Sequence, residues 1–248
     1  LGAVAEVAGA ALHTHLDVVL PALWKETYLE AEVAPNQRSV DPDLRDALVA
    51  SASAVALAVQ ADGLHFLIGE IRTATTAKAK AHVRIAAAAL IETVCKSSTL
   101  DLSVHHSNLI QSLIGMFHAE EPAVQRSGIR GLDNLVKSLP KERYPLHVAA
   151  LREAVKSVSA EHRANELAAG AARDEPSFLP AFCLPNGLGA LVAVHLQGLM
   201  TGTPELREQS AAALGEAVGL TSPAALKPYV IQITGPLIRI VGDRFPPA

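Results

Sequence analysis

Two stretches of this chain, Val83–Ile91 (VRIAAAALI) and Val124–Leu132 (VQRSGIRGL), share the pattern that decides its fold. In each, an apolar residue is followed at helical spacing by small residues, and then by a leucine or an isoleucine. Copies also begin at Val4, Leu44 and Leu206, and the anchors at 4, 44, 83 and 124 are spaced by 40, 39 and 41 residues. A period near this length with two helices per unit is typical of HEAT and armadillo-type solenoids. We therefore predict an all-α solenoid of HEAT-type helix pairs, with about five to six repeats.

The same pattern predicts the two helices of each pair. One helix of each pair, which we call the inner helix, carries the small residues that let neighbouring helices approach closely. We expect inner helices at 1–12, 41–60, 79–97, 121–139 and 204–220. Bulkier apolar residues at helical spacing predict outer helices at 15–30, 63–74, 105–117, 147–158 and 226–241. Leu206 lies 82 residues after Val124, which is two periods, so one poorly patterned copy is expected near residue 165.

Several residues mark the ends and bends of these helices. Asp41, Glu121 and Thr203 each precede a proline, and Thr203 is the better of the last two as a helix cap. Pro21 and Pro236 fall inside two predicted outer helices. A proline there removes one backbone hydrogen bond and bends the helix, and bent first helices are common in HEAT units.

Composition supports a helical chain without a membrane span. Half of the 248 residues are hydrophobic but only 4% are aromatic, and Ala and Leu favour helix over strand. The net charge of −4 gives no general basic excess for binding phosphate, so specific DNA binding is not expected. No apolar run reaches membrane-spanning length, and two cysteines favour a reducing compartment, which we take as the cytoplasm. We expect the chain to be part of a longer protein.

The region 163–187 interrupts the pattern. It contains three prolines, two glycines and a weak helical signal, so we predict HEAT repeats at 1–162, an irregular loop or degenerate repeat at 163–187, and HEAT repeats again at 188–248. The loop is either a tolerated insertion or, less simply, a binding loop.

Catalytic signatures are absent, and we predict no enzyme, no cofactor and no metal. The sequence has no GxSxG, HExxH, GxxxxGK[ST] or CxxC motif. The neighbouring His105 and His106 point about 100° apart on a helix and cannot easily share an ion. Cys183 lacks nearby cations that would favour a thiolate and is interpreted as a small buried hydrophobe. An enzyme built on His and Cys residues is the weakest alternative.

Basic residues recur early on the predicted inner helices and allow two interpretations. They are Arg45, Arg84, Arg126, Arg130 and Arg207, with Lys78 and Lys80 before Arg84. If the helices stack in register, these residues form a strip that contacts ribosomal RNA or an acidic protein. Alternatively they pair with acidic residues of neighbouring repeats in an internal ladder, with Asp43, Asp46, Glu121 and Glu208 as partners.

The last segment carries a candidate binding site. Arg239, Asp243, Arg244 and Phe245 close an apolar helix, with Gly242 at its expected end. Arginine and aromatic residues together are typical of interface anchors. The alternative is that Arg239 simply favours the negative end of the helix dipole.

The C-terminal part of the chain also resembles a known family. FCLP at 182–185, PEL with the following EQ and AAALG at 204–215, SPAALKPYV at 222–230 and above all ITGPLIRIVGDRF at 233–245 resemble the C-terminal part of the translational activator of the general amino-acid control pathway. Over most of residues 1–160 the resemblance is weaker but colinear. The segment 164–179 departs from it, because it is longer and richer in alanine than the family pattern.

The resemblance implies a giant cytoplasmic HEAT-repeat scaffold that binds ribosomes and activates the kinase of initiation factor 2 alpha. In that family a C-terminal HEAT region contacts the RWD domain at the N-terminus of the kinase. The resemblance also implies an arginine needed for this contact in the last segment of the chain, and Arg239 and Arg244 are both candidates for it. The family continues into another inner helix where this chain stops. If that helix completes the kinase-binding surface, this chain alone is expected to bind the kinase weakly.

A different HEAT adaptor, such as a nuclear-transport receptor or a phosphatase scaffold, is the alternative function. Such proteins share the period of the repeat but not the ITGPLIRIVGDRF run, and binding to ribosomes rather than to a transport GTPase would separate the two.

Overall fold

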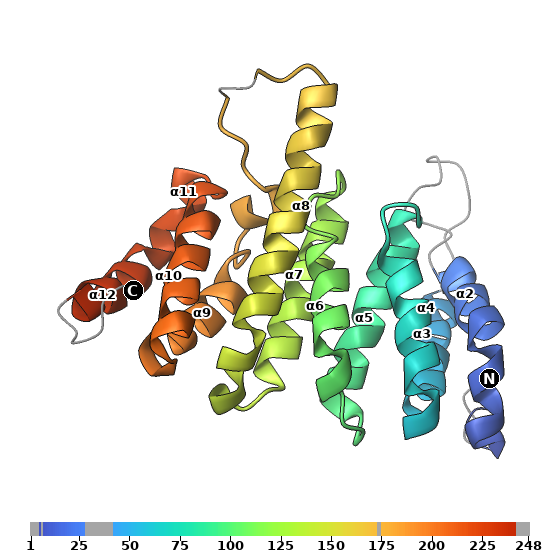
Figure 1. Ribbon diagram of the computed structural model, residues 1–248. Coiled ribbons are helices and arrows are strands. Elements are labelled where there is room, and N and C mark those ends of the chain that lie inside the picture. The colour runs from blue at the N-terminus through green and yellow to red at the C-terminus, as the bar shows by residue number, and fades with distance from the viewer. Residues whose placement is uncertain (1–4, 6, 28–41, 173–174, 242–248) are drawn as a thin grey trace. The chain divides into compact units, whose positions relative to one another are not determined.

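The computed structural model describes residues 5, 7–27, 42–172 and 175–241 (Figure 1). It divides into two compact units, Leu1–Met116 (unit 1) and Phe117–Ala248 (unit 2). Within the described ranges every regular element is an α-helix or a 3-10 helix. The predicted all-α class is therefore confirmed, and the helices pair and stack in each unit as HEAT-type packing requires.

Unit 1 consists of two rows of helices. Its elements are the 3-10 helix η1 (Gly9–His15), α2 (Leu16–Thr27), α3 (Pro42–Leu57), η2 (Ala61–Gly63), α4 (Leu64–Thr75), α5 (Ala81–Ser97), η3 (Ser103–His105) and α6 (His106–Ile114). α4 packs against both α2 and α6 in one row, while α3 packs against α5 in the other. The predicted inner and outer helices of this unit are thus confirmed for α2 to α6. The predicted helix at 1–12 differs, because its described end belongs to a 3-10 helix.

The spacing of apolar residues explains why these helices pair. On α4, the side chains of Leu64, Leu67, Ile68 and Ile71 are buried, and they recur every three or four residues on one face. On α5, the buried residues include three successive alanines, Ala86 to Ala88. Alanine lets two helix backbones come close, so that a bulky row and a small row fit together.

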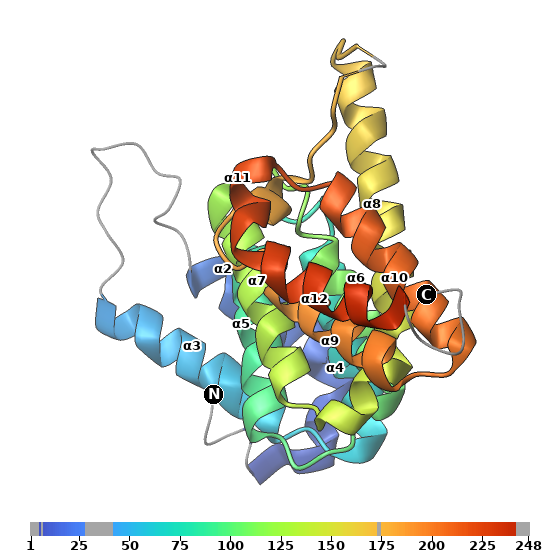
Figure 2. The same ribbon diagram turned by 90° about the vertical axis from the view of Figure 1, so that its left-hand side faces the viewer.

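Unit 2 also has two rows. Its elements are α7 (Pro122–Lys137), η4 (Lys141–His147), α8 (Val148–Ala168), η5 (Pro180–Cys183), α9 (Gly189–Thr201), α10 (Pro204–Gly219), α11 (Pro223–Leu226), η6 (Lys227–Tyr229) and α12 (Val230–Val241). α7 contacts α9, and α9 contacts α12, whereas α8 contacts α10. Figure 2 shows α7 on one side of this unit and α8 and α10 on the other.

The predicted rows of α10 and α12 are therefore wrong. α10 lies in the row of α8 and α12 in the row of α7, so the 82-residue spacing from Val124 to Leu206 joins helices of different rows rather than counting two repeats. The alternation is shifted by α9, which the pattern does not predict as either an inner or an outer helix. Its buried residues, such as Leu191, Val192 and Val194, point to several sides, and a helix that is apolar all round shows no periodic face.

The region 163–187 has local structure that its composition does not predict. α8 continues to Ala168, and Figure 1 shows its last turns extending beyond the neighbouring helices of unit 2. Farther along, Leu179, Ala181 and Phe182 are buried. The Leu179 N–H donates to the Leu220 carbonyl at 2.9 Å, and the Ala181 N–H donates to the Phe117 carbonyl at 3.1 Å. The domain limits at 162 and 187 stay a prediction, but residues 179–187 are packed onto the helices.

The structure confirms some of the residues predicted to cap or bend helices and not others. Thr203 caps α10, since its hydroxyl accepts a hydrogen bond from the Leu206 N–H at 3.3 Å. Glu121 makes no side-chain cap bond to α7, and Asp41 lies outside the described residues. Pro21 and Pro236 do lie inside α2 and α12.

Among the described parts of the chain, no single helix is both long enough and apolar enough to cross a membrane. Two successive segments, Asp46–Leu57 and Ala61–Thr75, satisfy the length and composition only when they are taken together, and they are bent by 108° at the break between them.

Candidate functional site

The predicted C-terminal site is described in part. Arg239 lies in the last turn of α12, and its side chain is exposed. Asp243, Arg244 and Phe245 lie outside the described residues, and so does Gly242. Their predicted role at an interface therefore stays a prediction, and the local geometry rests on α12 itself.

α12 carries apolar residues both on its buried face and on its exposed face. Ile233 and Ile240 are buried, whereas Ile231 and Ile238 are 85% and 74% exposed. The two exposed isoleucines are seven residues apart, which places them on one stripe two turns apart. Arg239 follows directly after Ile238, so a cation borders the exposed apolar stripe. An exposed apolar stripe with a cation at its edge is suited to contact with another protein.

The predicted basic strip does not form as one surface. Arg84 is buried, and its guanidinium donates to the Gly115 carbonyl at 3.5 Å. Arg207 is half-buried on α10, in the other row of unit 2 from Arg126 and Arg130. Lys78 and Lys80 are exposed before α5, and the side chain of Arg45 lies outside the described residues. The arginines of α7 are thus the part of the predicted strip that the structure brings together.

An interhelical ion pair of the predicted kind is present, but it joins different residues. Arg152 of α8 donates twice to Glu216 of α10, with distances of 2.6 Å from Nη2 to Oε1 and 3.0 Å from Nε to Oε2. Lys156 approaches the same carboxylate at 3.5 Å. The hydrogen bond from Arg152 lowers the pKa of Glu216 below its ordinary value. One ion-pair site therefore links two neighbouring helices of one row, whereas the ladder through Asp43, Asp46, Glu121 and Glu208 stays a prediction.

A basic hollow lies along the exposed face of α7. Its volume is about 360 Å³, and it is lined by Arg126, Ile129, Arg130, Asp133, Lys137, Pro185, Asn186 and Gly189. The four charged residues fall at intervals of four, three and four, which is one face of a helix. Lys137 Nζ pairs with Asp133 Oδ2 at 2.6 Å. We call this site the α7 hollow.

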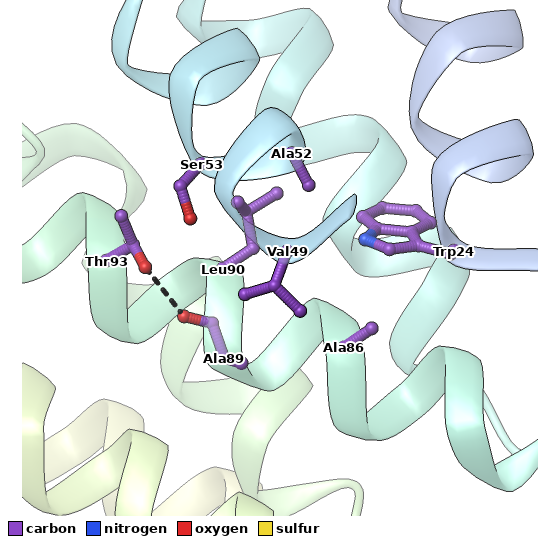
Figure 3. A pocket seen from close by; sticks show the side chains of 8 residues that line it. All are labelled: Trp24, Val49, Ala52, Ser53, Ala86, Ala89, Leu90 and Thr93. Carbon is purple, nitrogen blue, oxygen red and sulfur yellow. Dashed lines mark hydrogen bonds between the residues drawn. The ribbon is translucent and has the colours of Figure 1, made fainter. Parts of the chain in front are cut away.

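A second, smaller hollow lies between α3 and α5 in unit 1. Its volume is about 60 Å³, and Figure 3 shows the residues that line it, which are Trp24, Val49, Ala52, Ser53, Ala86, Ala89, Leu90 and Thr93. The Thr93 hydroxyl donates within its own helix to the Ala89 carbonyl at 3.2 Å. The indole Nε1 of Trp24 is buried and has no hydrogen-bond acceptor among the described residues.

The surroundings of the histidines and cysteines in the described ranges are those of packed side chains. His13 is buried, and its Nε2 accepts a hydrogen bond from the Gln60 N–H at 3.1 Å. No group of three His, Cys, Asp or Glu residues within the described ranges could hold a metal ion. Cys183 is half-buried. Burial, with the charge of Glu92 as a second cause, raises the pKa of the Cys95 thiol to about 12, so this thiol stays protonated.

The basic residues Arg126 and Arg130 were predicted from the sequence, but the hollow beside them was not. The spacing of Arg126, Arg130 and Lys137 along one helix face is visible in the sequence. The opposite wall comes from Pro185, Asn186 and Gly189, and the first two of these lie at the end of the region predicted as an irregular loop, 163–187. No local pattern shows that this loop packs beside α7.

Comparison with known proteins gives one consistent result. The family model described as stalled ribosome sensor GCN1-like, HEAT repeats, matches residues 1–186. Over 246 residues, the chain is 37% identical to Protein ILITYHIA of Arabidopsis thaliana, 32% to stalled ribosome sensor GCN1 of Homo sapiens and 31% to eIF-2-alpha kinase activator GCN1 of Saccharomyces cerevisiae. Each alignment covers 99% of this chain, which spans about 8% of the length of these relatives. No solved structure gives a significant match.

Proposed function

This chain belongs to the GCN1-like family of HEAT-repeat proteins, and from that premise we propose that it is a non-catalytic scaffold segment of a ribosome-associated activator of the initiation-factor-2-alpha kinase. The observation that carries the proposal is the match to this family over residues 1–186, together with similarity to three named relatives over nearly the whole chain. Two of those relatives are named for sensing stalled ribosomes and for activating this kinase.

The mechanism we propose is geometric. Paired helices bury their apolar faces against one another and hold the exposed faces in fixed relative positions within each unit. Partners then dock on side chains that the helices present, and no covalent bond is made or broken. The activity of the scaffold would be to hold the kinase near a stalled ribosome in the response to amino-acid starvation.

We propose that α12 contributes to the contact with the RWD domain of the kinase. The exposed stripe of Ile231 and Ile238 would bury apolar surface on the partner, and Arg239 at its edge would pair with a carboxylate. Asp243, Arg244 and Phe245 continue the same predicted site beyond the described residues.

The first prediction tests this contact with the purified chain and a purified RWD domain. Ile238→Ala and Arg239→Ala should each weaken binding about tenfold in biolayer interferometry, because each removes an anchor of the proposed interface. Lys141→Ala removes an exposed cation elsewhere in unit 2 and should leave the affinity unchanged. The measurement is repeated with the natural full-length protein, which supplies any further helix that the interface needs.

Unchanged binding by both α12 variants in the full-length protein would remove α12 from the interface. Melting followed by circular dichroism is the matched control, because both side chains are exposed and their removal should not change the melting temperature.

Ribosome association is tested separately. We expect the full-length protein to sediment with ribosomes on a sucrose gradient, which also places it in the cytoplasm. Failure to sediment with ribosomes from starved or stalled cells would contradict that part of the proposal. The alternative of a nuclear-transport receptor or phosphatase scaffold is not supported by the family to which the chain belongs.

A further inference from the structure

A stretch without acidic residues surrounds the turn that joins α4 to α5 in unit 1 (Figure 1). Residues 71–91 contain Arg72, Lys78, Lys80 and Arg84 and no Asp or Glu, although the whole chain has a net charge of −4. Arg84 is buried, whereas Arg72, Lys78 and Lys80 are exposed. We call residues 72–80, which carry these three exposed cations, the basic turn.

Acids of neighbouring helices do not neutralise the three exposed cations. Within the described ranges, none of their side chains forms an ion pair or a hydrogen bond. Asp46 lies on α3, which packs against α5, and this exposed acid is not paired with them either. Farther along α5, by contrast, Lys96 pairs with Glu92 at 2.6 Å. The charge of the basic turn is therefore available to a partner.

The basic turn is ordered by its own backbone. The Thr76 N–H and the Thr76 hydroxyl both donate to the Thr73 carbonyl, at 3.4 and 2.9 Å. The Ala79 N–H donates to the Thr76 carbonyl at 3.0 Å. At the start of α5, the Lys80 carbonyl accepts from the Arg84 N–H at 3.1 Å. A turn that is already ordered loses less entropy when a partner binds.

The residue types of the basic turn favour a partner that carries phosphate groups. Residues 72–80 contain no aromatic residue and no apolar residue larger than alanine. The centre of a protein–protein interface is enriched in aromatic residues and depleted in lysine. Contacts to phosphate oxygens come from lysine, arginine and threonine side chains, and the basic turn exposes all three types.

The absence of aromatic residues also decides between single and double strands. Proteins that hold single strands stack the bases on aromatic side chains, which residues 72–80 do not contain. Double-stranded RNA is bound through its shape, its phosphates and its 2′-hydroxyl groups. Exposed cations on an ordered turn can make such contacts without reading any base.

We propose that the basic turn binds the phosphate backbone of double-stranded RNA, with Arg72, Lys78 and Lys80 each contacting a phosphate. The choice of RNA rather than DNA rests on the proposed association with ribosomes. The site lies in unit 1, so it is separate from the proposed kinase contact of α12 in unit 2. It recognises the charge of the duplex backbone and not a base sequence.

The test titrates the 248-residue chain into a fluorescently labelled RNA duplex of about 20 base pairs, a length that exceeds a typical double-stranded RNA footprint, and follows anisotropy. The duplex should bind at low salt, and its affinity should fall about 40-fold between 50 and 200 mM salt, as expected for three phosphate contacts. Lys78→Gln should weaken binding and reduce the slope of log affinity against log salt by about one. Replacing Arg72, Lys78 and Lys80 together by glutamine should abolish binding.

Lys141→Gln is the matched control, because it removes an exposed lysine of η4 in unit 2 and should change neither the affinity nor the slope. All variants should keep the circular dichroism spectrum and the melting temperature of the parent, since the substituted side chains are exposed. If the triple variant does not keep them, the salt slope of Lys78→Gln decides the result.

Three outcomes would overturn the proposal: no binding of the RNA duplex at 50 mM salt, the same salt slope for Lys78→Gln and the parent, or tighter binding of single-stranded RNA or duplex DNA than of duplex RNA. The titration contains no ribosomes, so its failure would not change the sedimentation expected of the full-length protein. A full-length protein that did not sediment with ribosomes would contradict the proposed function, while the result with the purified duplex would stand.

Discussion

Single residues in this chain are fixed by the backbone that passes beside them. Gly187 closes the turn after η5, and a Cβ atom built there would overlap the carbonyl oxygen of Ala181. Gly215, on the exposed side of α10, has nothing within 4 Å of the same position. The two glycines look alike in the sequence, yet only Gly187 is required by the packing.

The pair provides a residue-scale prediction. Gly187→Ala should lower the free energy of unfolding by about 1–3 kcal/mol, because backbone has to move to admit the methyl group. Gly215→Ala should raise it by up to about 1 kcal/mol, because alanine favours helix over glycine. Urea unfolding followed by circular dichroism measures both. Equal midpoints for Gly187→Ala and the parent protein would mean that the turn is not packed as described.

A well-defined polar contact between helices of unit 2 lies between α8 and α10. Arg152 and Glu216 are 25% and 32% exposed, so solvent screens the pair in part. Its two hydrogen bonds and its position between neighbouring helices of one row distinguish it from a pair within one helix. Lys96 and Glu92, four residues apart on α5, are an example of the latter.

A double-mutant cycle measures the difference at the scale of elements. Arg152→Ala, Glu216→Ala and the double variant should give a coupling energy of about 1 kcal/mol, as expected for a partly screened bidentate pair. The same cycle on Lys96 and Glu92 should give about 0.3–0.5 kcal/mol. A coupling between Arg152 and Glu216 no larger than that of the α5 pair would show that the contact does not hold α8 to α10.

Stability of unit 2 as a whole should depend on pH through His195. This residue is 1% exposed on α9, and its Nδ1 has no hydrogen-bond partner in the described part of the chain. Burial, followed by the charge of Arg152, lowers its pKa to about 4 from an ordinary value of 6.5. The unfolded chain therefore binds a proton between these values that the folded chain does not, and acid in this range favours unfolding.

The sign and size of the effect follow from that difference. Stability contributed by neutral His195 is fully present above pH 6.5 and is lost as the pH falls toward 4. Between pH 7 and pH 5 the loss should be about 2 kcal/mol. Urea unfolding at the two pH values measures it, and His195→Leu should flatten the dependence by that amount. The same pH dependence in the variant and the parent would assign the effect to other groups.

At the scale of the molecule, much of the fold could be predicted, because a helix with one buried face places apolar residues every three to four positions in the sequence. α3, α5, α7 and α10 begin within two residues of their predicted starts, since their small and apolar residues recur at helical spacing. α9 was beyond this reasoning, because its buried residues face several neighbours. The rows of α10 and α12 were then misassigned, because α9 shows no periodic apolar face and was left out when the repeats were counted.

The candidate sites divide in the same way. Arg239 and the two arginines of α7 could be selected from residue type and spacing. The exposed stripe of Ile231 and Ile238 could not, because an apolar residue on a helix gives no sign of whether a neighbour covers it. The α7 hollow also needs Pro185, Asn186 and Gly189, far along the chain, to form its second wall.

Sequence alone thus determined that the chain is helical, that its helices pair, and that it belongs with the GCN1-like proteins, because helix period and family similarity are both properties of residue order. Tertiary structure decided which helices share a row, which arginines converge and which apolar side chains stay uncovered. These depend on contacts between residues distant in the chain, where packing rather than local preference sets the arrangement.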